Sequence, residues 1–237
     1  MLAPRRMMMA AAGASVGATI PDPNTELVHH WRADLGITVA TGVSAWLDQV
    51  GSADWAQGTG SAQPLYSASD VGFNNQAILN FDAGNDQWMT CTISAVVQPL
   101  HIFMALSIVS WRDGDLILCQ PSGPTIEMSG SAYDLKQEAG TASTNIVDHR
   151  APSAFLLQSA FDGASSFQAR NDGAHEDAGD PGADDYSAAT FAIGALTGGP
   201  PNAANMKVAE VAIYSAFQAG ADETTIEDYF NTRYSLW

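Results

Sequence analysis

An alternation of side chains near the C-terminal end constrains the fold more than any other feature of the sequence. Residues 206–214 read Met-Lys-Val-Ala-Glu-Val-Ala-Ile-Tyr, which has the two-residue period of a half-buried β-strand. The period predicts Ala209, Val211 and Ile213 on one face, and Val208, Glu210 and Tyr214 on the other.

The period then changes to that of a helix. After residue 220, one helical face is predicted to carry the apolar residues Ile226, Tyr229, Phe230 and Tyr234. Asp222 is placed to cap the N-terminus of this helix. A strand that leads into a terminal amphipathic helix predicts that the strand is central in its sheet. We expect the helix to pack across the end of that sheet.

The rest of the chain consists of short apolar stretches separated by Gly, Pro, Asn and Asp. Such a series predicts two stacked antiparallel sheets. The stretch 100–109 is apolar on both faces, which suits a strand in the middle of a sandwich. Strands are expected near residues 26–32, 43–48, 76–81, 87–93, 100–109, 115–119, 125–129, 154–161, 165–170, 190–195 and 206–214.

Several stretches also resemble a known family, the concanavalin A-like (laminin-G-like) jelly-roll domains. At the C-terminal end, the similar stretches are 209–215 (Ala-Glu-Val-Ala-Ile-Tyr-Ser) and 229–236 (Tyr-Phe-Asn-Thr-Arg-Tyr-Ser-Leu). Nearer the N-terminus they are 27–36 (Leu-Val-His-His-Trp-Arg-Ala-Asp-Leu-Gly), 43–51 (Val-Ser-Ala-Trp-Leu-Asp-Gln-Val-Gly) and 75–84 (Asn-Gln-Ala-Ile-Leu-Asn-Phe-Asp-Ala-Gly).

The resemblance covers residues 24–237, with a poorly matched middle. It implies an all-β fold: a concanavalin A-like jelly-roll β-sandwich of two antiparallel sheets with a C-terminal helix. Residues 1–23 lie outside the resemblance, and we expect them to form an N-terminal extended arm. The jelly-roll fold occurs in lectins, hydrolases, adhesion modules and viral coat proteins alike. The resemblance therefore implies a fold without choosing a function.

Composition excludes some partners. Of the 237 residues, 46% are hydrophobic and 15% charged, which is typical of a folded protein, and one large domain suffices for this length. A net charge of −17 argues against binding nucleic acid or an anionic membrane surface, both of which need clustered Lys and Arg. The sequence also lacks an apolar run of the ~20 residues that cross a bilayer. We expect neither nucleic acid nor a membrane as partner.

Cys91 and Cys119 are the two cysteines. They could pair across neighbouring strands if their Cα atoms came within about 7 Å. Two buried free thiols are the preferred interpretation, because a core of this size needs no disulfide.

Residues 1–23 differ from the rest of the chain. Arg5 and Arg6 precede a run of small apolar residues, which superficially resembles a secretory signal peptide. The run consists of Ala, Gly and Met without a block of Leu or Phe, which argues against that interpretation. We expect instead an assembly arm that binds a copy of the same chain or another protein. Its contact residues would be Leu2, Arg5, Arg6, Met7, Met8 and Met9.

Residues 171–188 are acidic and rich in glycine, which predicts a long surface loop. Its carboxylates and His175 could hold Ca²⁺, which prefers six to eight oxygen ligands. The spacing Asp-x-Asp-x-Asp-Gly, which is typical of calcium loops, is absent, so a solvated loop without a metal or cofactor is the preferred interpretation.

The tryptophans are the remaining candidates for a binding role. Trp31 and Trp46 lie in family-like strands and are expected in the core. Trp111 stands beside Asp113 and Asp115 near a turn, where an exposed ring could stack on a sugar. Packing of Trp111 at a sheet edge is the preferred interpretation, and sugar binding is the alternative.

Function is predicted mainly by exclusion. The strand motif Glu-x-Asp-x-x-Glu, which places the catalytic carboxylates of laminarinase-type glycosidases on one face, is absent from the sequence. We therefore expect a protein that is not an enzyme. The preferred hypothesis is a structural component of a bacteriophage virion (capsid decoration, head fibre or tail), with or without a site for host-surface carbohydrate. The alternative is a secreted or cell-surface carbohydrate-binding, lectin-like module.

Overall fold

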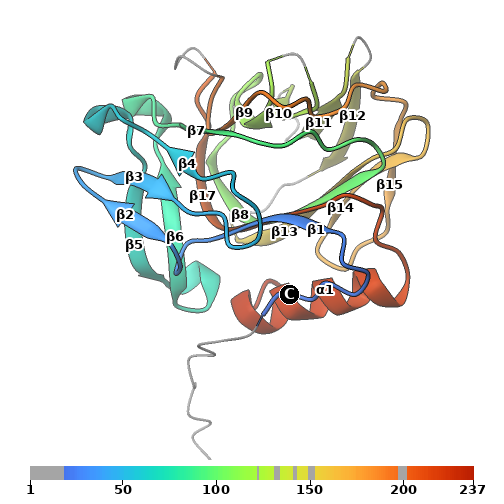
Figure 1. Cartoon of the computed structure of the whole chain (residues 1–237), viewed down its shortest axis with the longest axis horizontal. Helices are drawn as coiled ribbons and strands as arrows, with labels where there is room; N and C mark the ends of the chain where they lie inside the picture. The colour runs from blue at the N-terminus through green and yellow to red at the C-terminus, as the bar shows by residue number, and fades with distance from the viewer. Residues whose placement is uncertain (1–18, 122, 131–133, 141–142, 149–152, 197–201) are drawn as a thin grey trace, which may run out of the picture.

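The computed structural model describes residues 19–121, 123–130, 134–140, 143–148, 153–196 and 202–237. These residues form two antiparallel sheets stacked as a sandwich, with one α-helix against the outer face of the first sheet (Figure 1). The all-β class, the two sheets and the C-terminal helix predicted from the sequence are therefore confirmed.

The first sheet contains eight of the described strands. In spatial order they are β15 (Glu176–Gly179), β14 (Ser166–Arg170), β13 (Phe155–Phe161), β8 (Leu100–Ser110), β17 (Asn205–Tyr214), β6 (Gln76–Phe81) and β5 (Leu65–Asp70), with β1 (Leu27–Arg32) also paired to β17. The second contains nine: β12 (Ser143–Asp148), β11 (Asp134–Glu138), β10 (Thr125–Ser129), β9 (Leu116–Cys119), β16 (Thr190–Ile193), β7 (Met89–Thr92), β4 (Trp55–Ala56), β3 (Val43–Trp46) and β2 (Ile37–Val39).

The strand β17 is central, as its sequence predicts. Along one edge it pairs with β8 over nearly its whole length. Along the other edge it pairs first with β6, at Met206–Val208, and then with β1, from Glu210 to Tyr214. The junction between these two partners lies at Ala209, whose carbonyl accepts a hydrogen bond from the backbone N–H of Ala33.

A β-bulge at this junction corrects the predicted faces of β17. The register with β8 shifts between Val208 and Glu210, so Ala209 is an extra residue in the strand. As predicted, Val211 packs between the sheets, and Glu210 points to the opposite face. Val208 and Ala209 were assigned to the wrong faces. The bulge reverses the alternation, so Val208 joins the core between the sheets and Ala209 faces the helix.

The core between the sheets contains Trp31 and Trp46, as expected, and also Trp55; all three are fully buried. The indole N–H of Trp31 donates to the carbonyl of Ala53, and that of Trp46 to the carbonyl of Arg32. These bonds satisfy the polar ends of two large rings that would otherwise carry an unpaired donor into the core.

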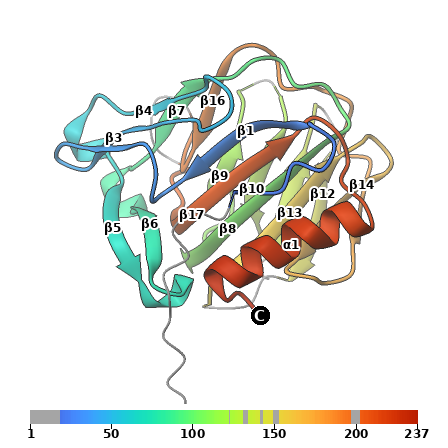
Figure 2. The same ribbon diagram turned by 60° about the horizontal axis from the view of Figure 1, so that its bottom comes forward.

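The helix α1 (Ala221–Tyr234) buries the four apolar residues that its period predicts. Its N-cap is Gly220 and not Asp222, which lies in the first turn beside Glu223. The helix lies on the outer face of the first sheet and not across its end (Figure 2). There it packs on Phe103 of β8 and Leu156 of β13. A face provides far more apolar area for an amphipathic helix than the end of a sheet.

Two predicted segments, the loop and the arm, contain residues that belong to the sandwich. The proposed loop 171–188 contains β15, which pairs with β14, and Tyr186, which is buried and bridges to Val96. Within the predicted arm, residues 1–18 lie outside the described residues. Ile20 is buried against the first sheet and helix, and the carbonyl of Pro21 accepts a hydrogen bond from the Tyr214 hydroxyl at 2.6 Å. These contacts attach Ile20 and Pro21, at the end of the predicted arm, to the domain.

The two cysteines are free and buried, as expected. Cys91 pairs in register with Phe191 on one side of β16, and Cys119 pairs with Ala192 on the other. An intervening strand separates the two thiols, and neighbouring strands lie about 4.8 Å apart. The resulting separation exceeds the reach of a disulfide. Burial raises the pKa of Cys119 to about 12 and that of Cys91 still higher.

Candidate functional site

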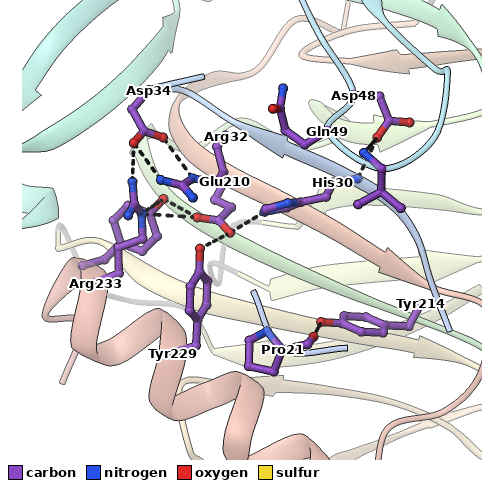
Figure 3. Close-up of polar contacts among 12 residues, drawn as sticks. Pro21, His30, Arg32, Asp34, Asp48, Gln49, Glu210, Tyr214, Tyr229 and Arg233 are labelled. Carbon is purple, nitrogen blue, oxygen red and sulfur yellow. Dashed lines mark hydrogen bonds and ion pairs between the residues drawn. The ribbon is translucent and has the colours of Figure 1, made fainter. Parts of the chain in front are cut away.

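A fully buried carboxylate lies between the first sheet and the helix. Glu210, turned toward α1 after the bulge in β17, has no exposed surface. Its Oε1 accepts from the Tyr229 hydroxyl at 2.9 Å and lies 2.6 Å from Nε2 of His30. Its Oε2 accepts from the Tyr234 hydroxyl at 2.5 Å. Figure 3 shows Glu210 between the strand residue His30 and the helix residue Tyr229.

Two arginines and a second carboxylate extend this cluster. Arg32, at the end of β1, donates through Nε and Nη2 to the two carboxylate oxygens of Asp34, at 3.0 and 2.8 Å. Arg233 of α1 donates to Oδ2 of Asp34 at 2.6 Å, and its Nε lies 3.5 Å from Oε2 of Glu210. We call these seven residues the ionic cluster: His30, Arg32, Asp34, Glu210, Tyr229, Arg233 and Tyr234.

The protonation of the cluster follows from these contacts. Burial alone would raise the pKa of Asp34, but the hydrogen bond from Arg32 and the charge of Arg233 lower that pKa below its usual range. Burial raises the pKa of the Tyr229 and Tyr234 hydroxyls, and the charge of Glu210 raises it further. Both tyrosines therefore stay protonated and donate to Glu210. The two arginines balance Asp34 and Glu210 in charge.

A cavity of about 310 Å³ opens beside the ionic cluster. His30 and Arg32 are 5% and 6% exposed and line it from β1. Four apolar side chains contribute to its walls: Ile20, Leu27, Leu35 and Val50. Thr19, Asp22 and Gln49 add polar groups. We call this space the β1 cavity. It combines an apolar wall with a small number of oriented polar groups, which is the usual composition of a small-molecule site.

The turn that carries Gln49 and Val50 is held in place by Asp48. Its Oδ1 accepts from the backbone N–H groups of His30, Val50 and Gly51 at 3.0 to 3.1 Å. Its Oδ2 lies 2.7 Å from Nδ1 of His29 and accepts from the N–H of Ala53. The turn is therefore anchored to β1 through the contact between Asp48 and His30 (Figure 3).

The predicted carbohydrate residues lie together at a different turn. The Trp111 ring is partly buried against the core, and its Nε1 donates to the carbonyl of Gly130. Asp113 is exposed, and its carboxylate accepts from the N–H of Gly130. Asp115 is 2% exposed and accepts from Nε of Arg112 at 2.6 Å. These contacts join the start of β9 to the end of β10. A sugar-binding role for this turn stays a prediction.

The other predicted sites are only partly within the described residues. Leu2, Arg5, Arg6, Met7, Met8 and Met9 of the assembly arm lie outside them. In the part of the chain that the structure describes, no group of three or more His, Cys, Asp or Glu side chains is arranged to hold a metal ion. Among those same residues, no helix is long and apolar enough to cross a membrane.

The sequence did not predict the β1 cavity. His30 and Arg32 were recognised only as part of the family-like stretch 27–36. Both His29 and His30 are buried, and each faces a carboxylate. The available signal was the presence of polar residues, His29, His30 and Arg32, among apolar neighbours in a predicted strand. Their partners, Asp48 and Glu210, are 19 and 180 positions away and could not be assigned from spacing.

Comparison with known proteins supports the fold. No protein-family model matches the chain, and a search of curated protein sequences found no match. Solved structures do match. The sialidase of Trypanosoma rangeli aligns in complex with the inhibitor DANA with a TM-score of 0.58, and in complex with sialic acid with one of 0.56. Each is 12% identical and covers 90% of this chain and 34% of the sialidase.

The receptor-binding domain of botulinum neurotoxin type G is also similar. Its TM-score is 0.57 at 10% identity, over 87% of this chain and 51% of that domain. The chain therefore spans about a third of the length of the sialidases and about half of the toxin domain. At such low identities the likeness shows a shared fold.

Proposed function

We propose that the protein is a non-enzymatic carbohydrate-binding module that holds one sugar residue of a glycan in the β1 cavity. The observation that carries this proposal is the composition of the cavity, in which two nearly buried polar side chains, His30 and Arg32, lie beside an apolar wall. A sugar ring has the same mixed character, since it presents hydroxyls at its edge and C–H groups on its faces.

The size of the cavity suits a single ring. Ligand pockets occupy about 300–1,000 Å³, and the β1 cavity is at the small end of this range. Since Asp34 and Glu210 balance the charges of Arg32 and Arg233, the cluster favours a neutral sugar over a strongly anionic one. The similar sialidase was solved with sialic acid, and the toxin domain is described as receptor-binding. These descriptions support a carbohydrate ligand as the class to test first.

Two features support a binding protein over a hydrolase. The paired-carboxylate strand motif is absent from the sequence. Glu210 is fully buried, and both of its oxygens face tyrosine hydroxyls of the helix. A buried carboxylate in such contacts cannot reach a glycosidic bond. Incubation with laminarin or agar should release no reducing ends; release that disappears on mutating a single Asp or Glu would contradict this part of the proposal.

A more specific proposal concerns the assembly to which the module belongs. We place this module in a bacteriophage virion, where it would attach through its N-terminal arm and bind host-surface glycans. The support is the sequence of residues 1–18, which combines small apolar residues with Arg5 and Arg6 on a chain of net charge −17. A secreted or cell-surface module is the alternative setting for the same binding function.

The binding function is tested by blocking the β1 cavity. A glycan array with neutral and sialylated glycans identifies a ligand, and calorimetry then measures its affinity for two variants. Val50 lines the cavity and is 51% exposed, whereas Val39 is 54% exposed and outside it. Val50→Trp should abolish binding, because its ring fills the cavity, and Val39→Trp should not. Unchanged affinity in Val50→Trp, with an unchanged melting temperature, would exclude the β1 cavity.

A further inference from the structure

A second concave site lies at the β14 end of the first sheet. It is an open groove of about 350 Å³, lined by Ala164, Ser165, Ser166, Phe167, His175 and Phe217. Three separate segments form it: the turn between β13 and β14 with the start of β14, the residues after β14, and the connection from β17 to α1. We call it the Phe217 groove. None of its residues takes part in the ionic cluster or the β1 cavity.

An exposed histidine in this groove is held from two sides. The His175 ring stacks on Phe167, with centroids 3.8 Å apart and planes 12° apart. Its Nε2 lies 2.6 Å from Oε1 of Glu223, a buried residue in the first turn of α1. The His175 side chain is nevertheless 38% exposed. A polar side chain that is both accessible and fixed loses little conformational entropy when a ligand binds it.

A phenylalanine provides an apolar surface beside this histidine. The Phe217 ring is 38% exposed. It packs edge-on against Phe167 at 5.3 Å and lies 5.6 Å from the buried ring of His101. The buried rings beneath it hold Phe217 in position, so that part of its surface faces solvent at a defined place. Exposed aromatic rings with fixed positions are common anchors in binding sites.

We propose that the Phe217 groove is a second sugar-binding site of the module. A pyranose ring would lay its C–H face over Phe217 and direct its hydroxyls to His175 and Ser165. This inference rests on the proposed carbohydrate-binding function and extends it to two sites on one domain. Two weak sites that engage one multivalent glycan surface strengthen binding without any further contact.

The experiment uses the full-length protein and methyl glycosides of glucose, galactose and mannose. Ligand-observed NMR detects binding, and the ¹⁵N signals of the His175 and His30 imidazoles report which site is occupied. In the wild type, both histidines should shift on titration. Phe217→Ala should lower the glycoside affinity of the Phe217 groove, measured from the His175 signal, by about tenfold. The affinity of the β1 cavity, measured from the His30 signal, should stay unchanged. Val71→Ala, at an 88% exposed position outside both sites, is the matched control.

The outcomes separate this inference from the proposed function. If the glycosides shift His30 but never His175, or if Phe217→Ala changes nothing, the groove is not a sugar site while the β1 cavity stands. If they shift His175 alone, the groove binds sugar and the β1 cavity does not. If no glycoside shifts either histidine at high millimolar concentration, both assignments are overturned.

Discussion

The Nη2 of Arg233, at the end of the helix, lies 2.6 Å from Oδ2 of Asp34, a residue 199 positions earlier in the chain. Asp34 in turn accepts from Arg32 at the end of β1. This bridge ties the C-terminal helix to the strand that lines the β1 cavity. The helix therefore helps to determine where Arg32 lies, although it contributes no residue to the cavity.

The first prediction concerns this bridge. The Arg233 side chain is 2% exposed, and its removal would leave the buried Glu210 without its nearest arginine and Asp34 with Arg32 alone. Arg233→Met should lower the free energy of unfolding by about 3–5 kcal/mol, as measured by urea denaturation at pH 7. Lys207→Met is the control, since Lys207 is 35% exposed and pairs with Asp70. It should cost less than about 1 kcal/mol. Equal losses in the two variants would contradict a structural role for the bridge.

The second prediction is a pH dependence from Asp48. Burial alone would raise the pKa of its carboxyl, but His29 and the backbone N–H groups of the turn lower it to about 2, from an ordinary 3.8. The unfolded chain therefore binds this proton at higher pH than the folded chain does. The resulting stability, about 2 kcal/mol, is present above pH 4 and is lost as the pH falls through 2.

Asp48→Asn isolates this contribution. At pH 7 the variant should be less stable than the wild type, because an amide supplies one acceptor oxygen where the carboxylate supplies two. The deficit should shrink between pH 4 and pH 2, as followed by urea unfolding at each pH. A deficit that is constant over this range would show that the ionised carboxylate contributes nothing.

The third prediction concerns His101, which is buried in β8 among aromatic rings. Burial, reinforced by the charge of His175, lowers its pKa to about 3, from an ordinary 6.5. Between these values the unfolded chain binds the proton and the folded chain does not, so stability decreases as the pH falls. The loss between pH 7.5 and pH 5 should be about 2 kcal/mol.

His101→Phe should remove this loss, because phenylalanine fits the same aromatic surroundings and does not titrate. The difference in unfolding free energy between variant and wild type should therefore shift by about 2 kcal/mol in favour of the variant from pH 7.5 to pH 5. Comparing the two proteins cancels the titration of the other histidines. Parallel stability curves would contradict the assignment.

The fourth prediction tests the N-terminal arm. Deleting residues 1–18 keeps Ile20 and Pro21, which pack on the domain. The melting temperature and circular dichroism should then stay those of the full chain. Oligomer formation, measured by sedimentation, or incorporation into particles should be lost, because the apolar and cationic contacts of the arm are gone. Unchanged assembly of the truncated chain would remove the support for a virion component.

Local patterns in the sequence predicted the helix and the main strands of the first sheet. These patterns indicate which residues are buried, because burial follows the period of the backbone. They are the alternation in β17, the helical period of α1 and the apolar runs of β8 and β13. Strands without such a pattern were missed. The side chains of β5 are mostly exposed or half-buried. The sequence of β15 is Glu-Asp-Ala-Gly, which has no apolar period. β5 and β15 can be identified as strands only in the tertiary structure, where each pairs with a neighbouring strand.

The sequence by itself determined the fold class, the central position of the last strand and the buried face of the helix, since each depends on side chains near one another in the chain. Only the tertiary structure decided the bulge at Ala209, the contact between Arg233 and Asp34, and the cavity between residues 19–35 and Gln49. These features depend on which strands become neighbours. Spacing along the sequence does not specify that choice, because it is set by the packing of the two sheets and the helix as a whole.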